Sequence, residues 1–365
     1  MKCLYCVAVF LCVGFKACSF SIAAEGTNPT EPEIRKPTPS EEKEAIDAVI
    51  DGWGRRRGRV ASVRYELEGT VSWDQGFFNE PMKPKHAKGE RIELANDVQP
   101  RNESGVLRMS IALDFENNRH RVESRRPLYD NLKAELAEVH SVNAFSDGTN
   151  WIRIIKGVRT RADSVRPHAD LLIRRGRVIP TLFNWEYSPI FFGHGIQLTQ
   201  GVSPRPGNLS PKISVFGTRY LRDEVAHDGS LCKVLAFLPG EPGERLYWID
   251  LERDSAVVRI EYRSGFEADI SYRKTAAGWL PSSWQITQRS KPQAKEKKTM
   301  TVAVKSIELN PEMKDSDFKI RIEPGMYVDE RFEEYGSNAR PKSVERYRLE
   351  ANGEKTALDS RLAPK

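Results

Sequence analysis

Cysteine is almost absent from the part of this chain that is expected to fold. Four of the five cysteines lie at positions 3, 6, 12 and 18, and only Cys232 follows them. A single cysteine cannot form an internal disulfide. With 365 residues, the chain is long enough to be stabilised by a hydrophobic core instead.

Long apolar runs are scarce as well, and the clearest one is at the N-terminus. Lys2 precedes an almost unbroken apolar stretch over residues 3–15, and small residues follow at Ala23 and Ala24. This order is typical of a secretory signal, here removed after Ala24. The sequence therefore predicts a periplasmic or secreted protein.

Two other interpretations of this N-terminus remain open. An uncleaved membrane anchor is disfavoured because Lys16 shortens the apolar run below the roughly 20 residues of a membrane span. Lipidation at Cys18 is disfavoured because Lys16 stands where a bacterial lipobox usually has a small or apolar residue. Residues 25–38, rich in Pro, Thr and Glu, are expected to be a disordered linker.

A strong excess of one charge is also lacking. Removal of residues 1–24 takes away two lysines, which leaves 55 of the 57 basic residues against 51 acidic ones and a net charge near +4. Nucleic-acid-binding domains usually concentrate basic residues on one face. The mixed signs along this chain therefore argue against a nucleic-acid partner.

Catalytic and cofactor motifs are missing from the sequence. No pair of the six histidines has metal-ligand spacing on a helix, and neither a phosphate-binding nor a dinucleotide-binding motif occurs. No Gly-x-Ser-x-Gly nucleophile motif occurs, and Cys232 lies in an apolar run typical of a packed strand. We expect no cofactor, no metal and no enzymatic activity, although two carboxylates that meet in the fold could still form a hydrolase site.

A helix is expected to begin at Pro39. Thr38 has the character of an N-cap, Pro39 suits the first helical position, and Glu41 completes a capping box. Apolar residues at helical spacing continue to Trp53, where glycines predict the end of the helix. Arginines 55–57 are interpreted as solvated cations at the negative end of the helix dipole.

After this helix the apolar period changes from 3.6 to 2, which predicts strands. Strands are expected over Val63–Trp73, Leu107–Phe115, Arg119–Arg125 and Ala144–Ile155. Residues 76–106 and 157–212 are interpreted as insertions. Helices are expected over 126–140 and 164–175.

The C-terminal half predicts an antiparallel meander of short strands joined by tight turns. Alternation around Trp248, Ile260, Ile270, Trp284 and Val302 marks its strands. A last strand is expected at residues 318–322, and residues 336–365 are expected to be a polar, frayed tail.

One face of the predicted sheet is rich in aromatic and aliphatic side chains. It can be an ordinary core packed on the helix from Pro39, or it can leave a cavity for an acyl chain. The candidate ligand-binding residues on this face are Tyr65, Leu67, Trp73, Met109, Ile111, Leu113, Trp151, Phe191 and Phe192.

The order of elements resembles the LolA/LolB-like fold of periplasmic lipoprotein carriers. The matching pieces are Pro39–Trp53, Val63–Trp73, the strand and turn Phe145–Thr149, Tyr247–Asp250, Gly278–Pro281, Asp317–Ile320 and Pro324–Asp329. The chain is much longer than those carriers, and no lid-locking residue of the family maps onto a specific position.

The resemblance implies an α+β fold that is mostly antiparallel β. Its curved sheet would form an open half-barrel, with an N-terminal helix and a few helices packed on the concave face, in a single domain over 39–335. The expected function is a binding or carrier protein for a lipid or lipidated protein, with membrane-surface contact and oligomeric state left open. A protein-interaction or sensor module on the same fold is the alternative, and a secreted hydrolase is the third.

Overall fold

The computed structural model describes residues 36–56, 58–75, 77, 103–130, 135–145, 151–156, 171–176, 186–195, 218–241, 243–289, 293–333 and 343–357. The expected signal at 1–24 and most of the expected linker at 25–38 lie outside these residues. Most of the two expected insertions also lie outside them.

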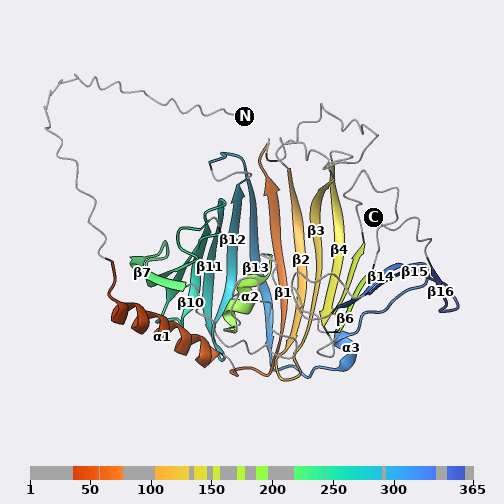
Figure 1. Cartoon of the computed structure of the whole chain (residues 1–365), viewed down its shortest axis with the longest axis horizontal. Coiled ribbons are helices and arrows are strands. Elements are labelled where there is room, and N and C mark those ends of the chain that lie inside the picture. Colours follow the sequence, from red (N-terminus) through yellow and green to blue (C-terminus); the bar gives the residue numbers. More distant parts are fainter. Residues whose placement is uncertain are drawn as a thin grey trace, which may run out of the picture. The chain divides into compact units, whose positions relative to one another are not determined.

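A single sheet of sixteen strands organises the described residues (Figure 1). Within the same described residues, three helices accompany it, namely α1 (Pro39–Arg56), α2 (Ser188–Gly193) and α3 (Asp315–Phe318). The strands are β1 (Ser62–Trp73), β2 (Glu103–Asp114), β3 (Arg119–Asp130), β4 (Glu135–Phe145), β5 (Trp151–Lys156), β6 (Leu171–Gly176), β7 (Thr218–Val225), β8 (Leu231–Phe237), β9 (Arg245–Asp250), β10 (Ala256–Tyr262), β11 (Phe266–Thr275), β12 (Gly278–Arg289), β13 (Lys297–Leu309), β14 (Tyr327–Glu333), β15 (Ser343–Leu349) and β16 (Lys355–Ala357).

The strand order places β1 between two arms of the sheet. One arm runs from β2 through β6 to β14, β15 and β16, and the other runs from β13 in descending order to β7. Neighbouring described strands are antiparallel except β6 and β14, which are parallel. Because β7 and β16 stand at opposite ends of this order, the curved sheet is open, as the sequence predicted.

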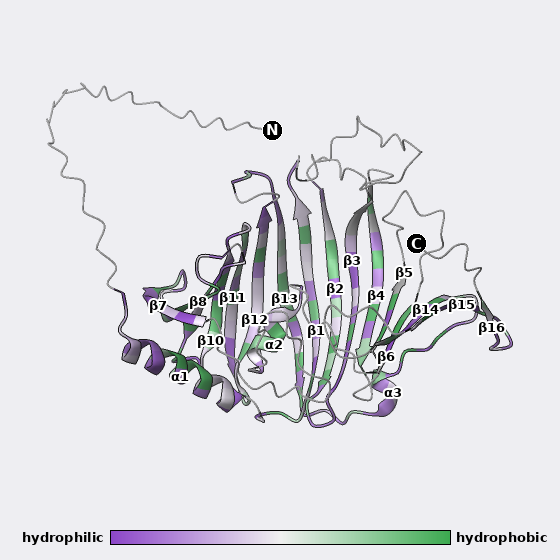
Figure 2. Ribbon diagram, in the orientation of Figure 1, coloured by the Kyte–Doolittle hydropathy of each residue, from purple (hydrophilic) through white to green (hydrophobic). Residues whose placement is uncertain are grey.

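Alternating side chains give the sheet two distinct faces. On β1, Val63, Tyr65 and Leu67 are buried while Glu66 and Glu68 are more exposed. Figure 2 shows the same alternation as hydrophobic and hydrophilic bands along the central strands. We define the inner face as the face that carries Tyr65; α1 and α2 both pack on it.

Helix α1 begins with the predicted capping box. The Glu41 carboxylate accepts hydrogen bonds from the Thr38 backbone amide (2.7 Å) and hydroxyl (2.9 Å), and the Glu41 amide donates to Thr38 Oγ1. The helix continues through Gly52, whose added Cβ would lie 1.9 Å from Ser255 Oγ. The close approach of α1 to the β9–β10 turn therefore requires glycine at this position.

The interpretation of the arginines at the end of α1 is wrong for Arg56. Its residue is 3% exposed, and its guanidinium donates to backbone carbonyls on other elements instead of contacting solvent. The helix extends to this residue, three positions past the expected end. The hydrogen bonds from Arg56 to these carbonyls hold the last turn in place, where it would otherwise fray into solvent.

Both helices expected in the first arm are wrong within the described residues. β3 continues to Asp130 and pairs with β4, so the segment around 126–140 is a hairpin. The four-residue spacing of its leucines fits the period of 2 of a strand as well as it fits a helix. The pairing of β3 with β4 selects the strand. Likewise, residues 171–176 form β6 between β5 and β14.

The C-terminal end of the chain also differs from expectation. Phe318 ends α3, and residues 319–323 form no strand, so the last strand of the meander was placed too early. Tyr327–Glu333 forms β14 instead, and Ser343–Leu349 pairs with it as β15. The expectation of fraying is therefore wrong for β15 and β16, which extend the sheet.

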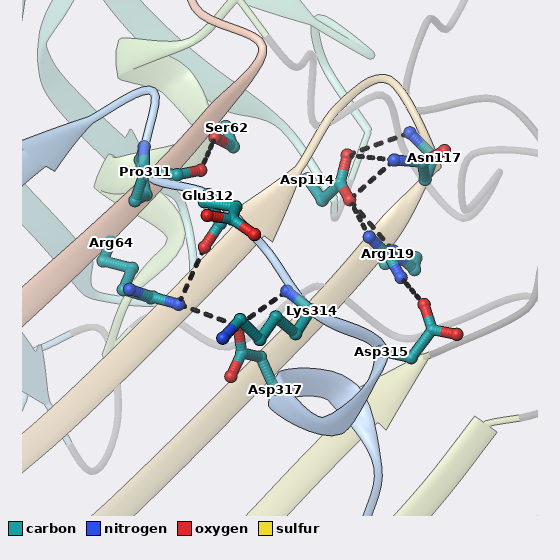
Figure 3. A network of polar contacts seen from close by, with 10 residues as sticks. All are labelled: Ser62, Arg64, Asp114, Asn117, Arg119, Pro311, Glu312, Lys314, Asp315 and Asp317. Atoms are coloured by element: carbon teal, nitrogen blue, oxygen red, sulfur yellow. Dashed lines mark hydrogen bonds and ion pairs between the residues drawn. The ribbon is translucent and has the colours of Figure 1, made fainter.

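A polar network fixes the turn between β2 and β3 to α3 (Figure 3). The Asp114 carboxylate accepts hydrogen bonds from the Asn117 backbone amide (2.9 Å) and from Arg119 Nε (2.9 Å). Arg119 also donates to Asp315 at 2.6 Å, and its guanidinium lies 4.6 Å from the centroid of the Phe318 ring. This network holds the end of β2 and the start of β3 beside α3.

Among the described helices, none has both the length and the apolar character that a membrane crossing would need.

Candidate functional site

The inner face of the sheet carries one continuous buried apolar cluster. It extends from Val122 on β3, through β1 and β13, to Leu235 on β8. Every candidate ligand-binding residue whose side chain is described belongs to this cluster, namely Tyr65, Leu67, Trp73, Met109, Ile111, Leu113, Phe191 and Phe192. The backbone of Trp151 pairs with β4 and β6, and its side chain lies outside the described part of the structure.

Helix α2 covers the middle of this face. All six of its residues are buried, and Ile190 and Phe191 have no exposed surface. The helix packs on β10 and β12, and Pro189 near its start supplies the fixed backbone angle that suits a first helical turn. Part of the expected insertion over 157–212 therefore forms a short helix that fills the inner face with side chains.

Close contact with β12 requires glycine at the end of α2. An added Cβ at Gly193 would lie 2.3 Å from Pro281 Cδ and 2.9 Å from Pro281 Cγ. The ring of Pro281 is held within β12, so a larger residue at 193 would push the helix away from the sheet.

Arg56 connects α2 to α1 and to two strand ends. Its Nη1 donates to the carbonyl oxygens of Gly193 (2.8 Å) and Trp279 (3.0 Å). Its Nε donates to Asp254 O at 2.7 Å, and its Nη2 donates to Arg253 O at 2.5 Å. Burial lowers the pKa of this guanidinium, and the four carbonyl dipoles compensate for the lost hydration.

A hydrogen bond between β1 and the segment after α2 completes the anchoring of this helix. Tyr65 Oη lies 2.7 Å from His194 Nε2, and both residues are buried. Burial, reinforced by the nearby positive charge of Arg56, lowers the pKa of His194 to about 3. Burial also raises the pKa of Tyr65 above its usual value. The pair is therefore neutral near pH 7, which suits an apolar interior.

Charged groups gather on the inner face beside the apolar cluster. Arg126 on β3 forms an ion pair with Glu186, which precedes α2 and is 7% exposed. Arg153 on β5 lies within electrostatic range of both residues, and burial lowers its pKa. Lys298 on β13 is also near Glu186 and Arg126, and its ammonium lies 5.7 Å from the centroid of the Trp73 ring.

The described residues offer little for covalent or metal chemistry. They contain no group of three or more His, Cys, Asp and Glu side chains that could hold a metal ion. Cys232 is buried on the opposite face, in a separate cluster with Val234 and Trp248, and burial raises the pKa of its thiol. What the inner face offers is apolar surface with a cationic region at one side.

Sequence reasoning missed the polar members of this site. One signal was available for Lys298, because it is in phase with Met300 and Val302 and so must face inward on β13. Arg126 carried no such signal, because it fell in a segment expected to be helical. Arg153 did carry one, because it lies two residues after Trp151 in an expected strand and is therefore in phase with a residue expected on this face. His194 contacts Tyr65, which is 129 positions away in the sequence, and Arg56 contacts Gly193, which is 137 positions away. Periodicity does not reveal contacts between such distant residues.

Comparisons with known proteins do not assign a family. No family model matches the chain, and no curated protein matches it. Several solved structures match the chain; among them, a β-barrel-like protein of the domain of unknown function DUF1849 from Brucella abortus has a TM-score of 0.24 and 8% sequence identity. The match covers 69% of this chain and 100% of that one. Function must therefore be inferred from the chemistry of the inner face itself.

Proposed function

We propose that this chain is a binding or carrier protein outside the cytoplasm that holds a lipid or the acyl chain of a lipidated protein on the inner face of its sheet. The single observation that supports the proposal is how that face is covered. Among the described residues, the cover over β10 and β12 is the six-residue helix α2, without a second sheet or a helical layer.

The chemistry of the cover favours an acyl chain as its replacement. Ile190 and Phe191 present hydrocarbon to the apolar cluster, as a fatty acyl tail would. Each methylene that leaves water contributes about 0.8 kcal/mol. A tail of ordinary length could therefore offset the loss of a few buried side chains, and the open edge of the sheet leaves the face without a closed barrel wall.

The first test is whether the protein retains lipid. The full chain would be purified without detergent, extracted with organic solvent and analysed by mass spectrometry. We expect lipid in stoichiometric amount, or saturable binding of a fluorescent fatty acid by lipid-free protein. Absence of both would contradict the proposal, and a stable protein partner without lipid would favour the sensor module instead.

A matched pair of substitutions separates a binding face from an ordinary core. Phe191→Ala weakens the cover, so it should lower stability and also tighten binding of the acyl probe. Val258→Ala removes buried hydrocarbon from the opposite face and should lower stability alone. If both variants leave probe binding unchanged, α2 does not compete with the acyl chain.

A further inference from the structure

The charged cluster on the inner face contains more positive than negative groups. Arg126, Arg153 and Lys298 surround the carboxylate of Glu186. Glu103 lies across Trp73 from Lys298 in the strand register and adds a second carboxylate. Among the described residues of this cluster, cations therefore still exceed carboxylates.

The register of the sheet places these groups on the apolar face and not on the outer one. Arg153 pairs with Asn143, Asn143 with Val122, and Val122 with Ile111, which belongs to the inner cluster. Lys298 pairs with Trp73, another member of that cluster. A ligand on the inner face would therefore have these cations at one end and hydrocarbon along the rest.

The cations are incompletely partnered. Nε of Arg126 and Nε of Arg153 are buried without a hydrogen-bond partner among the described residues. Arg153 forms neither a hydrogen bond nor an ion pair with any described residue. A buried guanidinium without an acceptor is unfavourable, because its hydration is lost without compensation. An anion with several oxygen atoms would supply the missing acceptors.

The segment that occupies this face already has the character of an amphiphile. Its first described residue, Glu186, places a carboxylate on Arg126, and Ile190 and Phe191 then fill the apolar cluster. We propose that Arg126, Arg153 and Lys298 form the headgroup site for an anionic single-chain amphiphile, for which the segment Glu186–Gly195 is a substitute within the chain. The carboxylate or phosphate of the ligand takes the place of the Glu186 carboxylate, and the tail of the ligand takes the place of the α2 side chains.

This inference rests on the proposed function, because it names the class of lipid that the inner face selects. The test compares ligands with one tail and different heads, below their micelle concentrations. Dodecanoate and dodecyl phosphate carry the anionic head, dodecan-1-ol and dodecyltrimethylammonium do not, and inorganic phosphate has no tail. Affinities of the full chain for each would be measured by calorimetry or tryptophan fluorescence.

We expect the two anionic amphiphiles to bind at least about tenfold more tightly than the alcohol, as charge-assisted hydrogen bonds to a buried guanidinium imply. Equal binding of all four tailed ligands would overturn the headgroup site and leave the proposed function intact. Binding of none would overturn both. Binding of inorganic phosphate as tight as that of dodecyl phosphate would overturn the amphiphile in favour of a free-anion site.

Three variants test the assigned residues. Arg153→Gln should weaken dodecyl phosphate binding about tenfold, while leaving stability unchanged or higher because it removes a half-buried charge whose Nε has no hydrogen-bond partner among the described residues. Glu186→Gln should strengthen binding, since it removes the competing carboxylate. Arg125→Gln is the matched control, because Arg125 neighbours Arg126 on β3 but is exposed. Weakened binding in this control, or unchanged binding in Arg153→Gln, would overturn the assignment.

Discussion

The hydroxyl of Tyr65 lies 2.7 Å from Nε2 of His194 in a site where neither residue is exposed to water. This bond joins the central strand of the sheet to the end of α2. It also makes the cover sensitive to protons, because the imidazole is held neutral by burial.

We expect stability to fall as pH decreases from 6.5 towards 5. Burial lowers the pKa of His194 to about 3, and it does the same for His120. Between these values and the ordinary value near 6.5, the unfolded chain binds protons that the folded chain does not. Each histidine therefore contributes stability above pH 6.5 that is progressively lost below it, about 2 kcal/mol by pH 5.

Denaturant unfolding at several pH values measures this effect. His194→Gln should reduce the slope of unfolding free energy against pH by about one proton in this range. His227→Gln is the control, because His227 is exposed. A slope that is unchanged in His194→Gln would show that the imidazole is protonated in the folded protein.

Gly193→Ala should detach α2 from the sheet. The new Cβ would meet the Pro281 ring at 2.3 Å, and overpacking of this kind costs about 1–3 kcal/mol. Thermal unfolding and hydrogen exchange at residues 190–195 would show the loss. Gly54→Ala tests the opposite case, because nothing lies within 4 Å of its added Cβ in α1, and helix propensity predicts a gain of up to about 1 kcal/mol. Equal effects of the two changes would contradict the contact with Pro281.

Arg56→Met should be among the most damaging single changes. It leaves buried carbonyl oxygens, among them Gly193 O and Trp279 O, without their donor, at a cost of about 3–5 kcal/mol if the loss resembles that of a buried ionic partner. Arg55→Met removes an exposed arginine from the same helix turn and should change stability by less than about 0.5 kcal/mol. Urea unfolding compares them, and similar midpoints would refute the anchoring role of Arg56.

Two carboxylates on Arg119 should differ in their contributions. The Asp114 side chain is 4% exposed and accepts several hydrogen bonds, whereas the Asp315 side chain is 79% exposed. Asp114→Asn should cost about 2–4 kcal/mol, because it disrupts a buried charged pair. Asp315→Asn should cost less than about 1 kcal/mol, as exposed ion pairs do. Unfolding free energies test this order, and a larger loss for Asp315→Asn would contradict it.

Acid should weaken the same turn. Burial acts to raise the pKa of Asp114, but the hydrogen bonds from Asn117 and Arg119 outweigh it and hold the pKa below its usual value. The charged carboxylate therefore stabilises the fold above the ordinary value near 4, and this contribution is lost as pH falls further.

Local chemistry was enough to predict the parts of the fold that do not depend on distant partners. The capping box at Thr38 and the alternation around Tyr65 specify α1 and β1 directly. The segment around Leu128 fits two periods, so pairing with β4 determined its structure. The hydrogen bonds of Arg56, and the approach of Arg153 to Arg126 and Glu186, arise only when segments far apart in sequence become neighbours. For this reason the charged side of the candidate site was not predicted.

The parallel pairing of β6 with β14 has a consequence for how the protein is made. Leu171 on β6 pairs with Val328 on β14, which is more than a hundred residues later in the chain. During synthesis or export, one edge of β6 therefore stays unpaired until β14 has been made. The same holds for β1 at the centre of the sheet, because Val63 pairs with Leu309 on β13. An exposed strand edge is a template for wrong pairing with another chain. We therefore expect chains interrupted before β14 to aggregate, and a chaperone that shields strand edges to raise the yield of the complete protein.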